Sequence, residues 1–169
     1  EVLENQERVV ITTGSKAVSE IRAESRHMGY DVIIIDYLQL LKADKTYKGN
    51  RYAEVGAVSR AIKALAMELN IPVIALSQLN RASEHYETKE PSMSDLREAG
   101  DIEQDASVIM LMWNCDENDR NKKGFKIEKQ RQGQTGKEVL YFDGNLMRFT
   151  ESEERPPDNW QSADDNPFT

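Results

Sequence analysis

The stretch Val32-Ile33-Ile34-Ile35-Asp36 carries four consecutive β-branched apolar residues and then stops at a carboxylate. Strands that are buried on both faces have uninterrupted apolar runs of this kind, whereas half-exposed strands alternate apolar and polar residues. The run therefore predicts a strand of a parallel sheet that is covered on both faces. A second such run, Pro72-Val73-Ile74-Ala75-Leu76, ends at Ser77 and Gln78 and predicts another strand of this sheet.

Helices and further strands are predicted around these two runs. Apolar residues recur at helical spacing over about residues 15–28 and 52–69, and a short helical stretch interrupted near Gly100 is expected over residues 94–105. Short apolar segments predict more strands at residues 8–13, 107–113, 124–128, 139–142 and 146–149, the last three joined by turns at residues 132–136 and 143–145. This order predicts an α/β fold in which a mostly parallel twisted sheet is flanked by helices and followed by C-terminal antiparallel β-hairpins.

The charge of the chain is unevenly distributed. The 169 residues suit one ordinary domain, and their formal net charge of -8 argues against a protein that coats DNA unspecifically. Residues 151–169 hold six acidic residues against one arginine, so this proline-containing segment predicts a disordered acidic tail. Residues 1–150 keep a net charge of -3, and within them residues 121–149 carry +4. The basic residues therefore concentrate in the segment that is expected to form hairpins.

Composition also bears on the compartment. The single cysteine, Cys115, excludes a disulfide framework and fits a reducing compartment such as the cytoplasm. No apolar run approaches the roughly 18 residues of a membrane-spanning helix, so no membrane partner is expected.

Polar side chains follow both buried runs, at the edge of a parallel sheet where ligands bind. Asp36 stands where a Walker B acid holds Mg²⁺ beside the phosphates of a nucleotide. The alternative is that Asp36 caps the following helix, as many strand-end aspartates do. Gln78 occupies the equivalent place after the second run, where an amide could sense a γ-phosphate or orient water. The alternative for Gln78 is a loop residue that faces solvent.

A phosphate-binding loop is missing from the sequence. The pattern G-x-x-x-x-G-K-[ST], whose backbone amides cradle phosphates, does not occur in the 169 residues. Residues 133–137 read GQTGK, but only two residues separate the glycines and Glu138 follows the lysine. Either the protein is not an NTPase, or the phosphate loop lies upstream of Glu1 in a longer parent protein.

Four strings in a fixed order carry a resemblance to a known family. They are IIDYLQLL at residues 34–41, SQLNR at 77–81, SDLREAGDIEQDA at 94–106 and EKQRQGQTG at 128–136. Together they resemble the C-terminal RecA-like motor domain of the DnaB family of replicative DNA helicases, over roughly residues 8–149. The resemblance implies that residues 1–150 are part of a RecA-like motor domain without its Walker A segment.

The resemblance also implies an activity and partners for the parent protein. Members of the family are hexameric rings that hydrolyse ATP with Mg²⁺ and move 5′ to 3′ on single-stranded DNA during replication in the cytoplasm. A helicase loader and primase are the further partners that it implies. This chain taken alone is expected to lack ATPase activity, because the phosphate loop is absent.

Seven residues receive roles from the resemblance. Asp36 is implied to coordinate Mg²⁺, and Gln78 to couple the γ-phosphate to the DNA-binding loops. The remaining five are implied to contact DNA in the central channel (Arg97, Glu98 and Gly100) or the ATP of the neighbouring subunit (Lys129 and Arg131). Alternation along a strand predicts that Lys129 and Arg131 point to one face.

These residues also have purely structural explanations, and the function has alternatives. Arg97 and Glu98, with Asp95, are also explained by a capped and solvated helix end, and the two basic residues by a solvated strand face. The function alternatives are a RecA-like recombinase that forms filaments and a non-catalytic domain that binds DNA or a partner protein.

Overall fold

The computed structural model describes residues 9–79, 90–96 and 100–151. The described residues fall into two compact units. The first unit contains residues 9–79, 92–96 and 100–107, and the second contains residues 90–91 and 108–151. The expected acidic tail at residues 152–169 lies outside the described residues.

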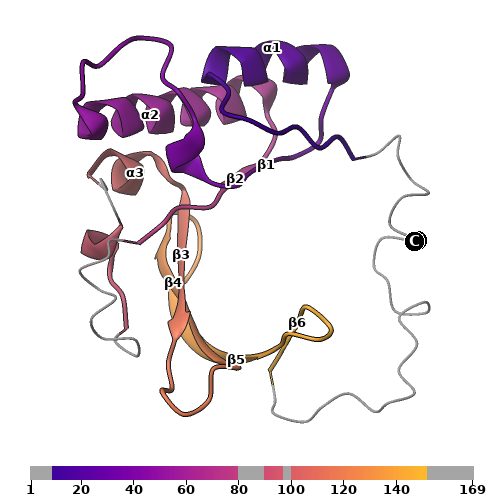
Figure 1. The fold of residues 1–169 in the computed structure, drawn as a ribbon, viewed down its shortest axis with the longest axis vertical. Coiled ribbons are helices and arrows are strands. Elements are labelled where there is room, and N and C mark those ends of the chain that lie inside the picture. Colours follow the sequence, from indigo (N-terminus) through magenta and orange to yellow (C-terminus); the bar gives the residue numbers. More distant parts are fainter. Residues whose placement is uncertain (1–8, 80–89, 97–99, 152–169) are drawn as a thin grey trace. The chain divides into compact units, whose positions relative to one another are not determined.

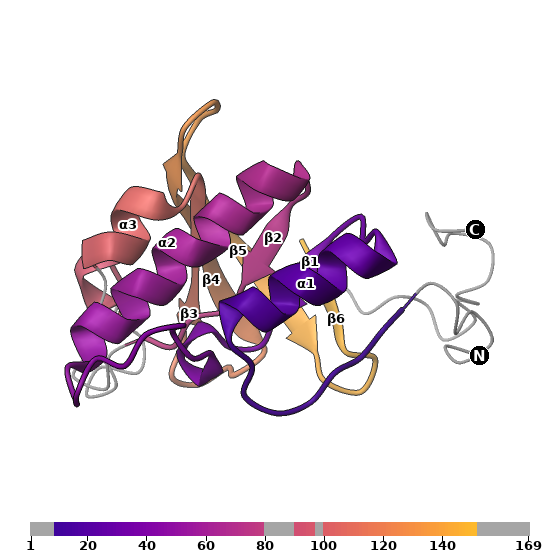
Figure 2. The ribbon, with the colours of Figure 1, turned by 90° about the horizontal axis from the view of Figure 1, so that it is seen from above.

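The first unit is built on a parallel pair of short strands (Figure 1). Strand β1 (Ile33–Ile35) pairs with β2 (Val73–Ala75), with Ile33 opposite Val73 and Ile35 opposite Ala75. Helices α1 (Val18–Met28) and α2 (Arg51–Leu69) lie side by side next to this pair (Figure 2). Two 3-10 turns, η1 (Leu38–Leu40) and η3 (Met93–Asp95), and the short helix α3 (Gly100–Asp105) complete the unit.

Local chemistry sets the ends of the two long helices. The Asn50 side chain caps α2 by accepting a hydrogen bond from the Ala53 N–H at 3.1 Å. Helix α1 starts at Val18 instead of near residue 15, because Ala17 forms a parallel bridge with Lys42 and is held in an extended conformation. Helix α1 ends at Met28, and the following Gly29 caps it with a φ of +67°, in the left-handed region that glycine adopts without strain. Both predicted helices are confirmed.

The core of the first unit lies between the helices and one face of the strand pair. Leu65 of α2 is fully buried there, with an exposed fraction of 0%. The buried apolar residues of this cluster are Val18, Ile35, Leu38, Leu41, Val55, Val58, Ile62, Leu65 and Ile102.

Two expectations about the sheet of this unit are wrong. The strand predicted over residues 8–13 is irregular and exposed at residues 9–13, because the described chain offers it no strand with which to pair. The β1 run is not covered on both faces either: Ile34 is 68% exposed and Ile74 of β2 is 52% exposed. The helices cover only the opposite face, which carries Ile35.

The second unit is a four-stranded antiparallel sheet in the order β3-β4-β5-β6. Its strands are β3 (Val108–Asn114), β4 (Lys122–Gln130), β5 (Gly136–Asp143) and β6 (Arg148–Thr150). Ile109 pairs with Lys129 and Met110 with Ile127, so Glu128 is the extra residue of a β-bulge in β4. The predicted hairpins are confirmed, and so is the α/β class. None of the helices in the described parts of the chain is both long and apolar enough to cross a bilayer.

Truncation of the central leucine tests this core. We expect Leu65→Ala to lower the free energy of unfolding by about 2–5 kcal/mol, because it removes buried methyl groups and leaves a cavity. The matched control is Met67→Ala, on the same helix at a side chain that is 71% exposed. Urea unfolding followed by circular dichroism measures both variants. Equal losses in the two variants would contradict the assigned core.

Candidate functional site

Asp36 and Gln78 lie on neighbouring segments at the carboxyl ends of β1 and β2. The two segments remain hydrogen-bonded beyond the strands, since the Leu76 N–H donates to the Ile35 carbonyl at 2.9 Å and the Leu38 N–H to the Leu76 carbonyl at 2.8 Å. The predicted juxtaposition of the two strand ends is therefore present. It places an acid and an amide at the edge of the sheet where ligands of such folds bind.

A hollow of about 300 Å³ opens at this edge, lined by Tyr37, Leu76, Ser77 and Gln78. The Gln39 amide donates a hydrogen bond of 3.0 Å to the Ser77 hydroxyl and ties the two strand ends together once more. Sequence reasoning missed this contact.

The capping alternative for Asp36 does not hold. The turn that follows β1 is η1, its cap residue is Tyr37, and no side chain closes that cap. The Asp36 side chain is exposed at the strand end instead.

Asp36 fits one mode of magnesium binding. Mg²⁺ keeps several waters and is bound by one or two carboxylates together with substrate phosphates, without a cage made only of protein. Within the described residues no three His, Cys, Asp or Glu side chains form a cluster suited to a metal ion. A single exposed carboxylate at the strand end, Asp36, is the donor that this mode requires.

The chain beyond Gln78 contacts the segment that leads to the predicted DNA loop. Leu79 forms an antiparallel bridge with Leu96, so the residue after Gln78 pairs with the residue before Arg97. Arg97 and Glu98 themselves lie outside the described residues, whereas Gly100 is the first residue of α3.

Asp95 has a structural role at the start of η3. Its carboxylate accepts hydrogen bonds from the Ser92 N–H at 2.8 Å and from the Ser92 hydroxyl at 2.9 Å, which is the geometry of a capping box. Asp95 therefore orders the entry to the loop.

Helix α3 is fixed to α2 on the other side of this loop. The Arg60 guanidinium forms an ion pair with Asp101 at 2.9 Å, and the Ser59 hydroxyl donates to the Asp105 carboxylate at 2.7 Å. Gly56 makes the close approach possible, since a Cβ at this position would lie 1.8 Å from the Asp101 Oδ2 atom. Sequence reasoning missed this clamp, although a glycine inside a predicted helix is a signal of close packing.

The two basic residues lie where β4 turns into β5 of the second unit. Lys129 is the penultimate residue of β4, but the strand ends at Gln130 and Arg131 belongs to the turn. The expected strand alternation therefore does not place both side chains on one face, because Arg131 lies beyond the end of the strand. The structure keeps them two residues apart at one end of a hairpin.

Comparison with known proteins identifies relatives that are replicative DNA helicases. Residues 1–151 match the family described as DnaB-like helicase C terminal domain. The chain is 43% identical over 152 residues to the replicative DNA helicase DnaB of Geobacillus stearothermophilus. The matched region covers 85% of this chain and 34% of the relative. It is 44% identical over 147 residues to the replicative DNA helicase DnaC of Bacillus subtilis, with 82% and 32% covered. The chain thus spans about a third of the length of these curated relatives.

Solved structures agree with the sequence relatives. A DnaB-like replicative helicase, described together with its interactions with primase, matches with a TM-score of 0.74 and 32% identity, over 85% of this chain and 37% of that chain. The structure of an ATPase domain matches with a TM-score of 0.73 and 35% identity, over 82% of this chain and 52% of that chain. The expected fold and the family resemblance are confirmed.

Gly56→Ala tests the clamp on α3. Alanine stabilises a helix interior by about 1 kcal/mol relative to glycine, so without the close approach this change would stabilise the chain. We expect instead that the new methyl group displaces Asp101 and raises hydrogen exchange of the α3 amides roughly five-fold, which corresponds to about 1 kcal/mol. Hydrogen exchange measured by mass spectrometry reads this out. Asp101→Ser removes both the Arg60 ion pair and the clash, so Gly56→Ala in the Asp101→Ser background should not raise exchange further. A further increase of roughly five-fold in that background would contradict the close approach of Gly56 to Asp101.

Proposed function

The chain belongs to the family of DnaB-like helicase C-terminal domains, and on that basis we propose that it is part of the motor of a replicative DNA helicase. The parent enzyme unwinds duplex DNA 5′ to 3′ with energy from ATP hydrolysis, as a ring of six copies. One observation carries the proposal beyond family membership: the strand end with Gln78 is bridged through Leu79 to Leu96, directly before the predicted DNA-contacting loop.

Asp36 and Gln78 have different roles beside the phosphates of the nucleotide. Asp36 would hold Mg²⁺, directly or through water, and this ion would supply positive charge beside the transferred phosphate. Gln78 donates its amide N–H to a γ-phosphate oxygen and loses this partner after hydrolysis. The Leu79–Leu96 bridge then carries the change at Gln78 to the loop, because the two backbones are hydrogen-bonded.

The DNA interaction follows from the chemistry of the loop. The Arg97 side chain and the Gly100 backbone N–H suit phosphate oxygens, and such groups hold the strand without reading its sequence. Glu98 cannot contact phosphate favourably, because it carries the same charge, and it orients a neighbouring residue instead. The clamp of Arg60 on Asp101 fixes the far end of the loop to α2.

Lys129 and Arg131 act on the nucleotide of the adjacent subunit. A pair of cations at the tip of a hairpin stabilises the negative charge of the transferring phosphoryl group, which is the main task in this chemistry. This role needs assembled subunits, so it ties hydrolysis to the ring.

The phosphate loop is assigned to a segment of the parent outside these 169 residues. The exposed apolar face with Ile34 and Ile74 supports this, because strands of a parallel sheet are normally covered on both faces. Primase, a helicase loader and a location at the replication fork in the cytoplasm complete the proposal. The solved relative that is described with primase supports the first of these partners.

The four sequence strings favour a helicase over a filament-forming recombinase. A non-catalytic role in binding DNA or a partner describes this chain only when it is separated from its phosphate loop.

Arg131→Ala in the full-length parent tests the proposal. We expect ATP turnover to fall at least 100-fold while ATP still binds, because the same subunit's nucleotide site keeps Asp36 and Gln78. Gln134→Ala in the same turn is the matched control and should turn over normally. Steady-state ATPase assays and a fluorescent nucleotide measure the two properties. Normal turnover by Arg131→Ala would remove the assignment to the neighbouring subunit.

Arg97→Ala tests the role of the loop in DNA binding. We expect weaker binding of single-stranded DNA and a salt dependence of log K that is shallower by about 0.7 for each phosphate that is no longer neutralised. ATPase activity without DNA should change little. Fluorescence anisotropy at several salt concentrations measures this, with Arg120→Ala, an exposed arginine before β4, as the control. Equal affinity and salt slope in Arg97→Ala and the unmodified protein would count against the loop.

A further inference from the structure

Two lysines face each other across the hairpin that carries Lys129 and Arg131. Lys126 of β4 and Lys137 of β5 are direct partners in the antiparallel register. Like charges in directly opposed positions destabilise a strand pair. Only one further β4–β5 pair, Ile127 with Gly136, follows the two lysines toward the turn, so their repulsion acts near the end of the β4–β5 pairing.

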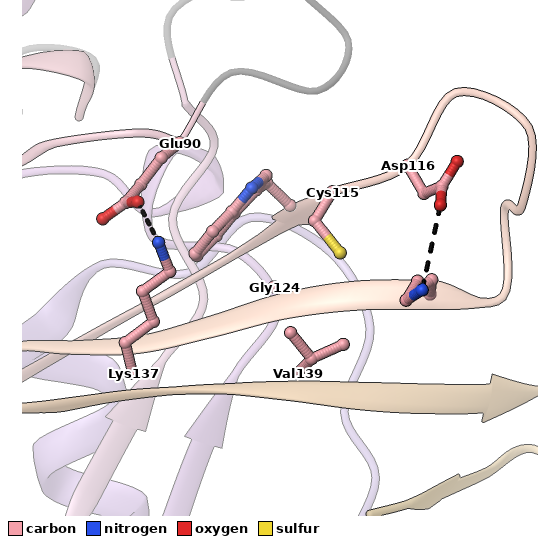
Figure 3. A pocket seen from close by; sticks show the side chains of 8 residues that line it. Glu90, Cys115, Asp116, Gly124, Lys137 and Val139 are labelled. Carbon is pink, nitrogen blue, oxygen red and sulfur yellow. Dashed lines mark hydrogen bonds and ion pairs between the residues drawn. The ribbon is translucent and has the colours of Figure 1, made fainter. Parts of the chain in front are cut away.

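One carboxylate bridges both lysines. Glu90 accepts from the Lys126 ammonium with its Oε1 atom at 3.0 Å and from the Lys137 ammonium with its Oε2 atom. Figure 3 shows the Glu90 side chain reaching Lys137 next to the hairpin. The two ammonium groups, that of Lys137 first and that of Lys126 second, hold the pKa of the Glu90 carboxyl below its usual range. Glu90 is therefore a carboxylate at neutral pH.

Other groups hold the two lysines in this arrangement. Lys126 is also paired with Glu128, the bulge residue of β4, at 2.5 Å. The pKa of Lys126 is raised, first by Glu128 and then by Glu90. The Lys137 ammonium lies 5.7 Å from the centre of the Trp113 ring, which favours the cation there. Both lysines thus contact one carboxylate.

The Trp113 ring itself is fixed by the backbone beneath it. A Cβ at Gly124 would lie 2.3 Å from the ring, so the indole packs directly on β4. Glu90, Trp113 and Lys137 line one hollow of about 360 Å³. Figure 3 shows Glu90 and Lys137 beside it. The bridge is therefore part of an ordered cluster beside the hairpin.

We propose that Glu90 is a positioning residue for the end of the hairpin that carries Lys129 and Arg131. By offsetting the repulsion between Lys126 and Lys137, it keeps β4 and β5 paired as far as Ile127 and Gly136. The paired strands then direct the two basic groups at the nucleotide of the neighbouring subunit. This inference rests on the proposed function for its catalytic consequence, whereas the electrostatic bridge itself belongs to the chain alone. Neither the sequence strings nor the family resemblance assigns a role to Glu90.

The bridge is tested first in the chain itself. We expect Glu90→Gln to raise hydrogen exchange at the ends of β4 and β5 next to the turn about five-fold. In the Lys137→Gln background, where no repulsion is left to cancel, the same change should have no effect. Glu138→Gln removes an exposed carboxylate one residue from Lys137 and is the matched control. An unchanged exchange rate in Glu90→Gln, or an equal increase in both backgrounds, overturns the proposal.

The positioning role is tested by kinetics of the full-length parent. We expect Glu90→Gln to lower kcat for ATP about ten-fold with KM unchanged, and Glu90→Gln/Lys137→Gln to recover the kcat of Lys137→Gln. A normal kcat for Glu90→Gln overturns the positioning role if Arg131→Ala abolishes turnover in the same preparation. If Arg131→Ala also turns over normally, the proposed function of the turn fails, and the exchange experiment still decides the bridge separately.

Discussion

The parallel pairing of β1 and β2, continued past the ends of both strands, is the constraint on which the candidate site depends. Two backbone hydrogen bonds, from Leu76 to Ile35 and from Leu38 to Leu76, keep the strand ends together. The side chains of Asp36 and Gln78 are exposed, so the pairing of the backbones beneath them determines their separation. The Leu79–Leu96 bridge extends the same hydrogen-bonded framework toward the loop proposed to contact DNA.

Helix α2 supports this framework from two sides. Its apolar side chains, Leu65 among them, bury the inner face of the strand pair, while Ser59 and Arg60 fix α3. The polar contacts on α2 lie at a partly exposed surface, and such ion pairs contribute little stability individually. Their value is geometric, because they hold α3 in one place relative to the strand ends.

Elements that depend on a pattern within one segment could be predicted from the sequence, whereas contacts between distant segments could not. The apolar runs predicted β1 and β2, helical spacing predicted α2, and glycine-rich turns predicted the hairpins. The strand at residues 8–13 failed because β-branched residues form a strand only where a partner offers hydrogen bonds. Asp36 and Gln78 were found from their place after the runs, whereas the bridge of Glu90 to Lys126 and Lys137 and the clamp at Gly56 join residues far apart in the chain.

The close approach at Gly56 has an evolutionary consequence. The space beside this glycine is filled by the carboxylate of Asp101, so the two positions share one fixed volume. In a relative with a larger residue at position 56, the side chain at position 101 must be shorter or must turn away from α2. Positions 56 and 101 should therefore vary as a pair among homologous chains, even though 45 positions of sequence separate them.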